Sequence, residues 1–546
     1  MKSKTSLFNW TVFRKDITRF FPVWAIYTAI WMISLSNLGN FGTAFVASDM
    51  ANSIPGSALV SAFYAPLVCM LLFGDMYQKR ICNGIHAMPV SRTTLFFSHT
   101  AAALCFYIVP NTLVALVQLV YLGRYWYISF YWLLGTTLIY ICFLGISLLC
   151  AFCTGKRFAM AVSYILVLSF SSIVYALFTS LYQPLLYGIR IREDLFAVLS
   201  PVASLANPLY VNVFLEDLGS RWTASVQIVS SDWLIMCIWA AVGIAAGAAA
   251  LLLYRRRHLE SAGSLITVKF LRPVFLVLYV LLFVMAFRIF DSIPAMLISL
   301  ILGYFTGLML LNRSRHVFSG KAWAGLGLFV GVIALSLVLT AVDVLGVTRW
   351  VPKPEDVKLV RLSSSSYIEY LVAEPFYMDD EVVTLRDPQD ISNAISLHKF
   401  AKGDGRSSSG KTIAFSIEYT LNNGDVRRRY YDIPVHSPEG QLFGQYLSRP
   451  EVLFGKDPEG FLAQASVTEL NGHSLTPQEQ ETVKQLLLAD CEAGYMAQDY
   501  AFRGSSSSFR LTLKQGNLTV MIQVYDLRSS LYQWIVQNGY SQRPNK

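Results

Sequence analysis

The stretch LLFGDMYQKRICNGIHAMPVSRTTL, from Leu71 to Leu95, decides how this chain is organised. An apolar run ends at Gly74, a polar and basic segment follows, and a second apolar run begins after Arg92. The intervening segment is too short for a domain and too polar to cross a bilayer. Its Lys79 and Arg80, together with Arg92 and a near absence of acidic residues, predict a loop on the cytoplasmic side of a membrane.

The composition agrees with a membrane protein. Of the 546 residues, 54% are hydrophobic and 14% are charged, with a mean hydropathy of +0.46, whereas soluble domains are about 25% charged. Residues 1–350 contain 24 Lys and Arg against 11 Asp and Glu, and residues 351–546 contain 20 against 24. We therefore expect the positive charge of the first part to set membrane topology rather than to bind nucleic acid, and the second part to be soluble.

Nine apolar runs are long enough to span a bilayer, which takes about 20 residues. They cover residues 20–38, 57–76, 96–121, 130–153, 158–180, 232–254, 272–290, 294–311 and 322–343. Alternate connecting segments, counted with Arg272 at a span edge, hold 18 of the 24 Lys and Arg of residues 1–350. This bias predicts a multi-pass protein of the bacterial cell membrane with a cytoplasmic N-terminus and, after nine spans, an extracytoplasmic C-terminal part. A miscount at the short connection 291–294 would reverse the last placement.

Two segments outside these spans have amphipathic or broken apolar patterns. Residues 1–19 place Leu7, Trp10 and Phe13 at helical spacing beside basic residues, which predicts an interfacial amphipathic helix or a plain basic leader. Residues 181–231 are partly apolar but are interrupted by prolines, which predicts either a hairpin dipping into the outer leaflet or a folded surface loop.

The basic loop ending in Pro89-Val90-Ser91-Arg92 resembles the loop after the second span in permease subunits of bacterial ABC transporters of the ABC-2 family. A second likeness, to Gram-positive members, is the basic stop followed by Glu-x-Ala-Gly at residues 254–263. The resemblance implies an N-terminal interfacial helix (1–19) and a six-span permease core (20–263). The three additional spans (264–349) and the extracytoplasmic C-terminal domain (350–546) are expected as additions outside it. The resemblance covers about half of the chain.

In that family the loop after the second span touches a separate ATPase. The resemblance therefore implies a non-enzymatic permease subunit of an exporter. This subunit would bind no cofactor itself, while ATP and magnesium belong to the partner ATPase. A second permease subunit, identical or related, and membrane lipid would be further partners. Within loop 77–95 the residues expected to contact the ATPase are Tyr77, Arg80, His86, Pro89 and Arg92.

The predicted spans contain glycines at a spacing typical of close helix packing, but they lack ionisable residues at mid-bilayer. Gly243 and Gly247 are four residues apart among alanines in the sixth span, a spacing that lets helices approach closely. Ionisable residues fall only at span edges. Because carriers driven by protons or sodium need such groups at mid-bilayer, this pattern disfavours an ion-coupled carrier and is compatible with an external ATPase as the energy source.

The C-terminal part, residues 351–546, contains two stretches with similar patterns. In the first, the pattern predicts a strand (357–362), a helix (389–400), a hairpin (412–431) and a helix (438–447). The second stretch repeats that order at 465–470, 476–489, 509–525 and 529–537. We therefore predict an α+β domain, and the repeated order indicates a duplicated β-α-β-β-α unit.

Catalytic and metal motifs are missing from the sequence. Residues 405–412 match G-x-x-x-x-G-K-T, but a helix is predicted before them and a strand after them, the reverse of a phosphate-binding loop. We interpret them as a flexible Gly/Ser loop. The seven histidines are scattered without metal-ligand spacing. An alternative to the permease is a membrane sensor that presents an external ligand-binding domain and does not transport.

Overall fold

The structure is a computed structural model. It describes residues 7–36, 43–86, 90–191, 193–206, 209–217, 222–231, 233–257, 264–268, 270–287, 293–364, 383–403, 412–454, 458–497, 509–515, 518–524 and 526–540. The chain forms two compact units: the membrane unit, Met1–Ser180 with Arg192–Ile333, and the C-terminal unit, Leu181–Ile191 with Ala334–Lys546. The predicted six-span core and additional spans thus fall mostly in one unit, and the short segment Leu181–Ile191 belongs to the other.

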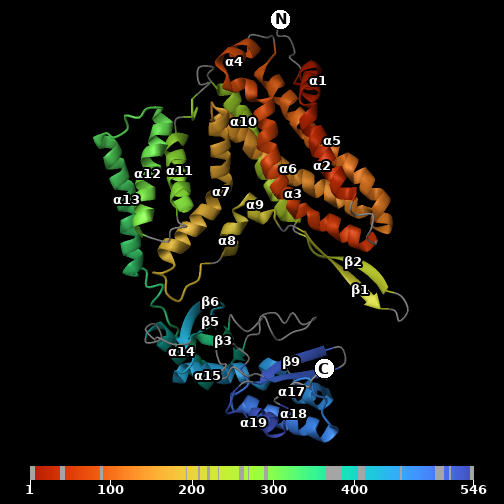
Figure 1. The fold of residues 1–546 in the computed structure, drawn as a ribbon. Coiled ribbons are helices and arrows are strands. Elements are labelled where there is room, and N and C mark those ends of the chain that lie inside the picture. Colours follow the sequence, from red (N-terminus) through yellow and green to blue (C-terminus); the bar gives the residue numbers. More distant parts are fainter. Residues whose placement is uncertain are drawn as a thin grey trace. The chain divides into compact units, whose positions relative to one another are not determined.

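Helices make up most of the membrane unit (Figure 1). They are α1 (Trp10–Arg19), α2 (Phe21–Ser36), α3 (Thr43–Leu72), α4 (Lys79–His86), α5 (Arg92–Leu122), α6 (Tyr127–Cys153), α7 (Arg157–Tyr182), α8 (Glu193–Val198), α9 (Pro201–Ser204), α10 (Trp233–Arg256), α11 (Leu271–Phe287), α12 (Ile293–Asn312) and α13 (Gly320–Ala341). Two strands, β1 (Leu209–Asp217) and β2 (Trp222–Ser231), form an antiparallel hairpin.

Seven of the described helices are long and apolar enough to cross a membrane: α3, α5, α6, α7, α10, α12 and α13. The other two predicted spans correspond to α2 and α11, which are apolar but have 16 and 17 residues. Helix α3 begins at Thr43, well before the predicted span start at residue 57. A count of apolar residues underestimates this helix because Ser, Asp and Asn lower the hydropathy of its first turns, although the alanines among them favour helical backbone.

Helix α6 is the centre of the membrane unit and contacts α3, α5 and α10. The rings of Tyr107 on α5 and Tyr140 on α6 stack in parallel with their centroids 4.0 Å apart. Their hydroxyls are satisfied internally, because Tyr140 Oη donates to the Ala103 carbonyl at 3.0 Å and Tyr107 Oη bonds Ser61 Oγ at 3.0 Å. Buried tyrosines are tolerated when the phenol finds such a partner.

The segment predicted as a leaflet hairpin or a surface loop has a different structure. It contains the short helices α8 and α9 followed by the β1–β2 hairpin. The β-branched and aromatic residues of LYVNVFLED and the alternation in WTASVQIVSS are the strand signals for this hairpin.

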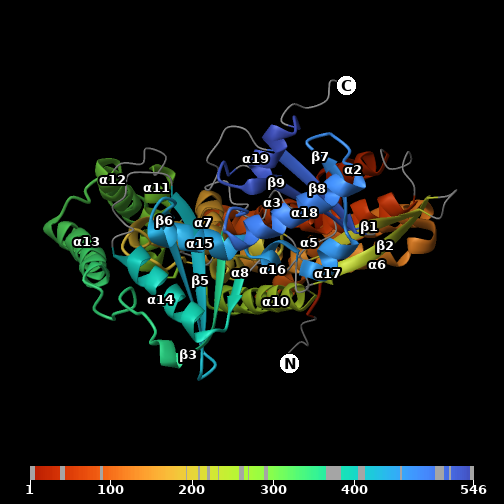
Figure 2. The ribbon, with the colours of Figure 1, turned by 90° about the horizontal axis from the view of Figure 1, so that it is seen from below.

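The C-terminal unit consists mainly of two lobes. Lobe A holds β3 (Val357–Ser364), β4 (Val383–Leu385), α14 (Pro388–Lys402), β5 (Thr412–Leu421), β6 (Val426–Pro434) and α15 (Pro438–Ser448). Lobe B holds β7 (Ser466–Leu470), α18 (Pro477–Glu492), β8 (Phe509–Gln515), β9 (Leu518–Val524) and α19 (Ser530–Gln537). Short helices α16 (Pro450–Phe454) and α17 (Pro458–Gln464) connect them. Figure 2 shows α14 and α15 over the sheet of lobe A.

Both lobes follow the predicted order β-α-β-β-α. Their strands are all antiparallel, in the order β4-β3-β5-β6 in lobe A and β7-β8-β9 in lobe B. Strand β4 is the addition that distinguishes lobe A. The helices begin at side-chain caps, such as Asp387 for α14 and Thr476 for α18, each followed by proline at the first helical position.

The segment Leu181–Ile191 joins lobe A through specific contacts. Tyr187 Oη donates to the Ala401 carbonyl at 3.0 Å, and the Tyr430 amide donates to the Gly188 carbonyl at 3.0 Å. Gly188 has a φ of +80°, and a Cβ there would collide with the Tyr431 ring. Lobe A is therefore completed by residues that lie far from it in the sequence, directly after α7.

Candidate functional site

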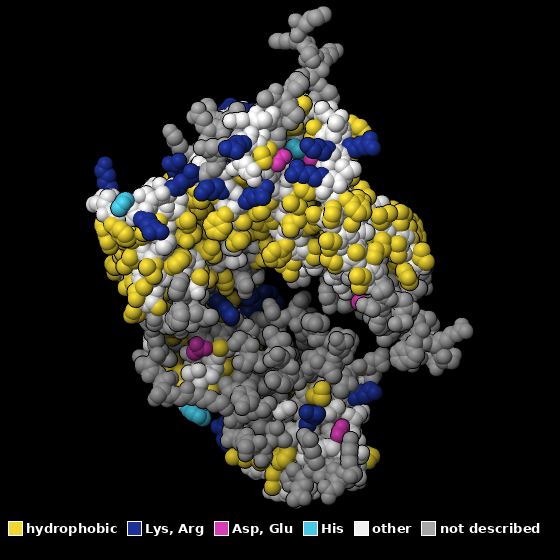
Figure 3. Space-filling view, turned by 45° about the horizontal axis from the view of Figure 1, so that its top comes forward, with side chains coloured by type: hydrophobic (Ala, Val, Ile, Leu, Met, Phe, Trp, Pro, Cys, Tyr) yellow, Lys and Arg dark blue, Asp and Glu magenta, His cyan; other side chains and the backbone are white. Residues whose placement is uncertain are grey.

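Basic side chains gather at the end of the membrane unit that carries α1 and α4. Figure 3 shows Lys and Arg above a broad belt of hydrophobic side chains in this unit. We call this region the basic end and define it by α1, α4, the first turn of α5, the start of α7 and the last turn of α10. All five residues predicted to contact an ATPase belong to the loop that runs across it.

Loop 77–95 contains a helix that the sequence analysis did not predict. After α3 the chain makes a 3-10 turn at Gly74–Tyr77 and then forms α4. Cys82 of α4 is buried, whereas Arg80 and Ile81 are exposed. Helix α4 is therefore amphipathic, and the spacing of Ile81, Cys82 and Ile85 is the signal that could have revealed it.

The predicted contact residues have different surroundings. Arg80 lies on the exposed face of α4, whereas Tyr77 is 8% exposed and packs in the core of the membrane unit. His86 ends α4, but its side chain lies outside the described part of the structure, as does Pro89 entirely. Only Arg80 and Arg92 of this set thus have described side chains that reach solvent.

Arg92 is partly buried and works as an internal clamp. Its Nη1 lies within hydrogen-bond distance of three carbonyl oxygens, those of Tyr254 (3.1 Å), Arg255 (3.3 Å) and Arg257 (2.7 Å). The last carbonyls of a helix lack partners within the helix and carry partial negative charge, so a guanidinium there is doubly favourable. Arg92 therefore joins the start of α5 to the end of α10.

Helix α1 is fastened to the same region. Asp16, which is 6% exposed, contacts His99 on α5, with Oδ2 and Nδ1 2.6 Å apart. The Asn9 amide donates to Ser98 Oγ at 2.9 Å, and the Arg19 guanidinium lies 3.8 Å from the Asp75 carboxylate in the 3-10 turn. A movement of the loop after α3 would therefore be transmitted to α1, α5 and α10 together.

A large groove opens between α3, α7 and α9. Its volume is about 840 Å³, and its walls are almost entirely apolar, with Phe63 and Leu67 from α3 and Ile165 from α7 among them. Arg157, the first residue of α7, is the cation among the lining residues. Its Nη2 would lie 2.7 Å from a Cβ added to Gly74, so the guanidinium packs against the turn after α3, at the basic end. Among the described residues it has no ion-pair partner.

The two glycines of the sixth predicted span differ in their contacts. A Cβ added to Gly243 would come within 2.5 Å of Cys142 Cα on α6, and Gly145 faces Gly243 from that helix. A Cβ added to Gly247 would meet nothing within 4 Å. Close approach of α6 and α10 thus depends on Gly243 and Gly145, and Gly247 lies outside this contact.

Other predicted motifs contribute no chemistry to the described structure. Residues 405–411 lie outside the described residues, but α14 precedes them and β5 begins at Thr412, as the sequence pattern predicts. The acidic residues 379–381 also lie outside the described part. Within the described ranges, no group of three or more His, Cys, Asp or Glu side chains could hold a metal ion.

Comparison with known proteins identifies no relative: no family model, curated protein or solved structure matches this chain.

Proposed function

We propose that this chain is the membrane subunit of an ATP-driven transporter of the ABC type, coupled to a separate ATPase through helix α4. The observation that carries the proposal is a short amphipathic helix held between two long apolar helices, with Arg80 and Ile81 exposed side by side. A cation beside an apolar side chain on an exposed helical face is typical of a protein-docking surface. Among the residues that the structure describes, Arg80 makes no ion pair that would explain its exposure.

The clamps around α4 support a mechanical role. Helix α4 contacts the 3-10 turn Gly74–Tyr77, and Arg92 connects the start of α5 to α10 through three carbonyl oxygens. The Arg19–Asp75 contact extends the connection to α1. An ATPase bound to α4 could therefore shift several membrane helices at once. Such a shift would couple ATP hydrolysis by the partner to a switch of the membrane helices between two conformations.

The groove between α3, α7 and α9 supports an amphiphilic substrate. Its apolar walls favour acyl or aromatic groups, and Arg157 favours a negatively charged head group at the basic end. In this proposal the cargo is an anionic amphiphile, and it moves away from the basic end, in the direction of export.

The test is co-purification of an ATPase with the tagged protein in mild detergent. Arg80→Glu is the decisive change because Arg80 is exposed and lies on α4. Arg92→Glu is unsuitable, since it would break the clamp on α10 and disturb the fold. Arg315→Glu is the matched control, because Arg315 is an exposed basic residue of the segment between α12 and α13, outside the basic end.

We expect ATPase activity in the eluate of the unaltered protein and of Arg315→Glu, and its loss from Arg80→Glu. Equal loss from both variants would show that net charge, not α4, determines the association. Absence of any ATPase, under conditions where a known ABC complex survives, would refute the permease proposal and favour the alternative, a membrane sensor.

A further inference from the structure

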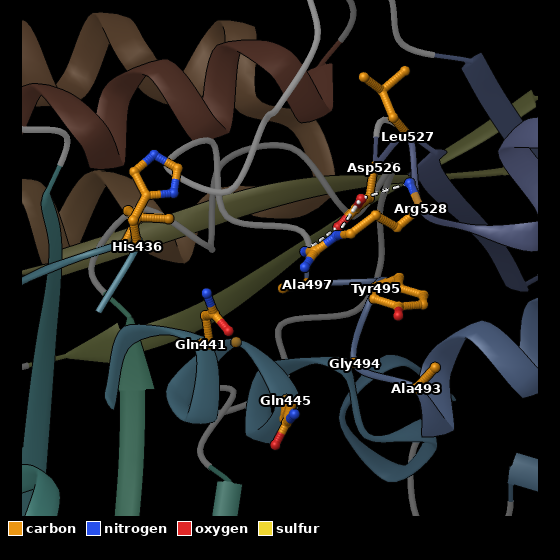
Figure 4. Close-up of a pocket in the computed structure, with 12 residues that line it drawn as sticks. His436, Gln441, Gln445, Ala493, Gly494, Tyr495, Ala497, Asp526, Leu527 and Arg528 are labelled. Carbon is orange, nitrogen blue, oxygen red and sulfur yellow. Dashed lines mark hydrogen bonds and ion pairs between the residues drawn. The ribbon is translucent and has the colours of Figure 1, made fainter. Parts of the chain in front are cut away.

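A crevice of about 310 Å³ lies between lobe A and lobe B, within the C-terminal unit (Figure 4). Lobe A contributes the connection from β6 to α15 and the first turns of α15. Lobe B contributes the chain after α18 and the connection from β9 to α19. Because the lobes share one element order, the β6–α15 and β9–α19 connections occupy equivalent positions. The crevice thus lies where the strand-to-helix connections at equivalent positions of the two lobes meet.

Arg528, from lobe B, is held in one orientation at the crevice. Its Nε and Nη2 donate to the Asp526 carboxylate at 3.1 and 2.8 Å, and its guanidinium lies over the Tyr495 ring, 5.0 Å from the centroid. Both nitrogens on one edge are used by Asp526, and Nη1 has no partner among the described residues. A guanidinium fixed in this way loses little conformational freedom when a ligand binds its free edge.

Two further polar side chains, from lobe A, border the same space. Gln441, in the first turns of α15, lies between His436 and Arg528 in Figure 4. The side chains of Gln441 and His436 are exposed, and neither makes a hydrogen bond to another described residue. Arg528 Nη1, the Gln441 amide and the imidazole N–H are all donors, whereas the Asp526 oxygens already accept from Arg528. The Gln441 amide and the imidazole can each also accept a hydrogen bond, so Arg528 Nη1 is the charged group that only an acceptor can satisfy.

The rest of the lining combines the polar side chains of Gln445 and Tyr495 with small and apolar residues, of which Val435 and Ala497 are buried and Leu527 is exposed at the rim. A volume of about 310 Å³ corresponds to roughly ten water molecules at about 30 Å³ each. A ligand that matches this site has an acceptor-rich head, a short apolar side chain and the size of one or two amino-acid residues.

We propose that the crevice binds a small carboxylate that carries an apolar side chain, with the carboxylate on Arg528 Nη1 and Gln441. A carboxylate suits this pair because its hydrogen bond to a guanidinium is charge-assisted and its two oxygens can accept separately, one from Arg528 Nη1 and one from the Gln441 amide. A free amino acid and the C-terminal residue of a peptide present this same chemistry. The proposal rests on the two lobes alone and does not depend on transport or on an ATPase.

Calorimetric titration of the full chain in lipid nanodiscs tests the proposal. The probes are N-acetyl-leucine and its carboxamide, which differ only in the charged head. We expect N-acetyl-leucine to bind at concentrations up to about 10 mM and the carboxamide to bind at least about tenfold more weakly. Equal binding of both probes, or binding of neither, would overturn the proposal. Free leucine and the dipeptide Leu-Leu then distinguish the two sources, since the source is whichever binds more tightly.

Variants of the crevice test whether Arg528 and Gln441 bind the carboxylate. Arg528→Gln and Gln441→Ala are each expected to weaken N-acetyl-leucine binding at least about tenfold. Arg510→Gln, the same change at an exposed position of β8 outside the crevice, is expected to leave binding unchanged. Gln441 is exposed on α15, so its replacement leaves the fold intact even if Arg528→Gln perturbs lobe B. Unchanged binding in both crevice variants would contradict the assignment.

Discussion

His398 makes lobe A sensitive to acid. The imidazole is completely buried, and each ring nitrogen lies against a tyrosine hydroxyl: Nδ1 is 3.1 Å from Tyr419 Oη and Nε2 is 2.9 Å from Tyr431 Oη. A neutral imidazole offers one donor and one acceptor and satisfies both hydroxyls, whereas a protonated one offers two donors. Burial, with Arg429 and Lys402 nearby, lowers the pKa of His398 from 6.5 to about 3.

The direction of the pH effect follows from this lowered pKa. Below about pH 6.5 the unfolded chain takes up a proton at His398 that the folded lobe does not, until about pH 3. The stabilisation is therefore complete above the unfolded pKa and is lost progressively as the pH falls through this window. At about pH 5 the difference of roughly 1.5 pKa units corresponds to about 2 kcal/mol, or roughly a 30-fold change in the unfolding equilibrium.

Hydrogen exchange of the full chain measures the pH-dependent loss of stability in lobe A itself. After correction for intrinsic exchange rates, we expect the protection of peptides from β5 and β6 to fall about 30-fold between about pH 7 and about pH 5. His398→Gln keeps a donor and an acceptor but cannot be protonated, so it should remove most of the pH dependence while lowering protection at neutral pH. His436→Gln, at an exposed position, is the control.

Two results would refute the reasoning. Protection of β5 and β6 that is equal at both pH values in the unaltered protein would show that His398 does not resist protonation. A slope that persists in His398→Gln would assign the acid sensitivity to other groups of lobe A. Peptides from lobe B serve as the internal reference, because His398 lies in the core of lobe A.

Three other substitutions test packing and capping. Gly243→Ala should lower the free energy of unfolding of the membrane unit in detergent by about 1–3 kcal/mol, since α6 leaves no space for a Cβ, whereas Gly247→Ala should not change this free energy measurably. Asp490→Ala should destabilise lobe B by about 2–4 kcal/mol and raise amide exchange in α19, because the buried carboxylate accepts from Ser529 Oγ at 2.6 Å and from two backbone amides. Gly188→Ala should cost lobe A about 1–2 kcal/mol through its positive φ alone, visible as faster limited proteolysis; an unchanged rate would show that Leu181–Ile191 is dispensable.

The sequence alone determined the elements whose pattern is local. Alternating apolar residues gave β5, β6, β8 and β9, and long apolar runs coincide with the membrane-unit helices. The predicted helices beginning at residues 389 and 476 start within two residues of α14 and α18, whose first turns follow the caps Asp387 and Thr476. These features depend on neighbours a few positions away, so a single sequence contains them. Short amphipathic elements such as α4 and the β1–β2 hairpin carry weaker signals and were not predicted.

Only the tertiary structure decided which of these elements act together. The contact of Arg92 with the end of α10 spans more than 160 positions, and that of Tyr187 with Ala401 spans 214. In neither pair does the sequence around one residue indicate which distant residue it contacts. The same holds for the crevice, where Gln441 and Arg528 come from different lobes. Periodicity fixes which face of an element is buried, but the side chains that meet across elements depend on how the faces pack, and that information is not local.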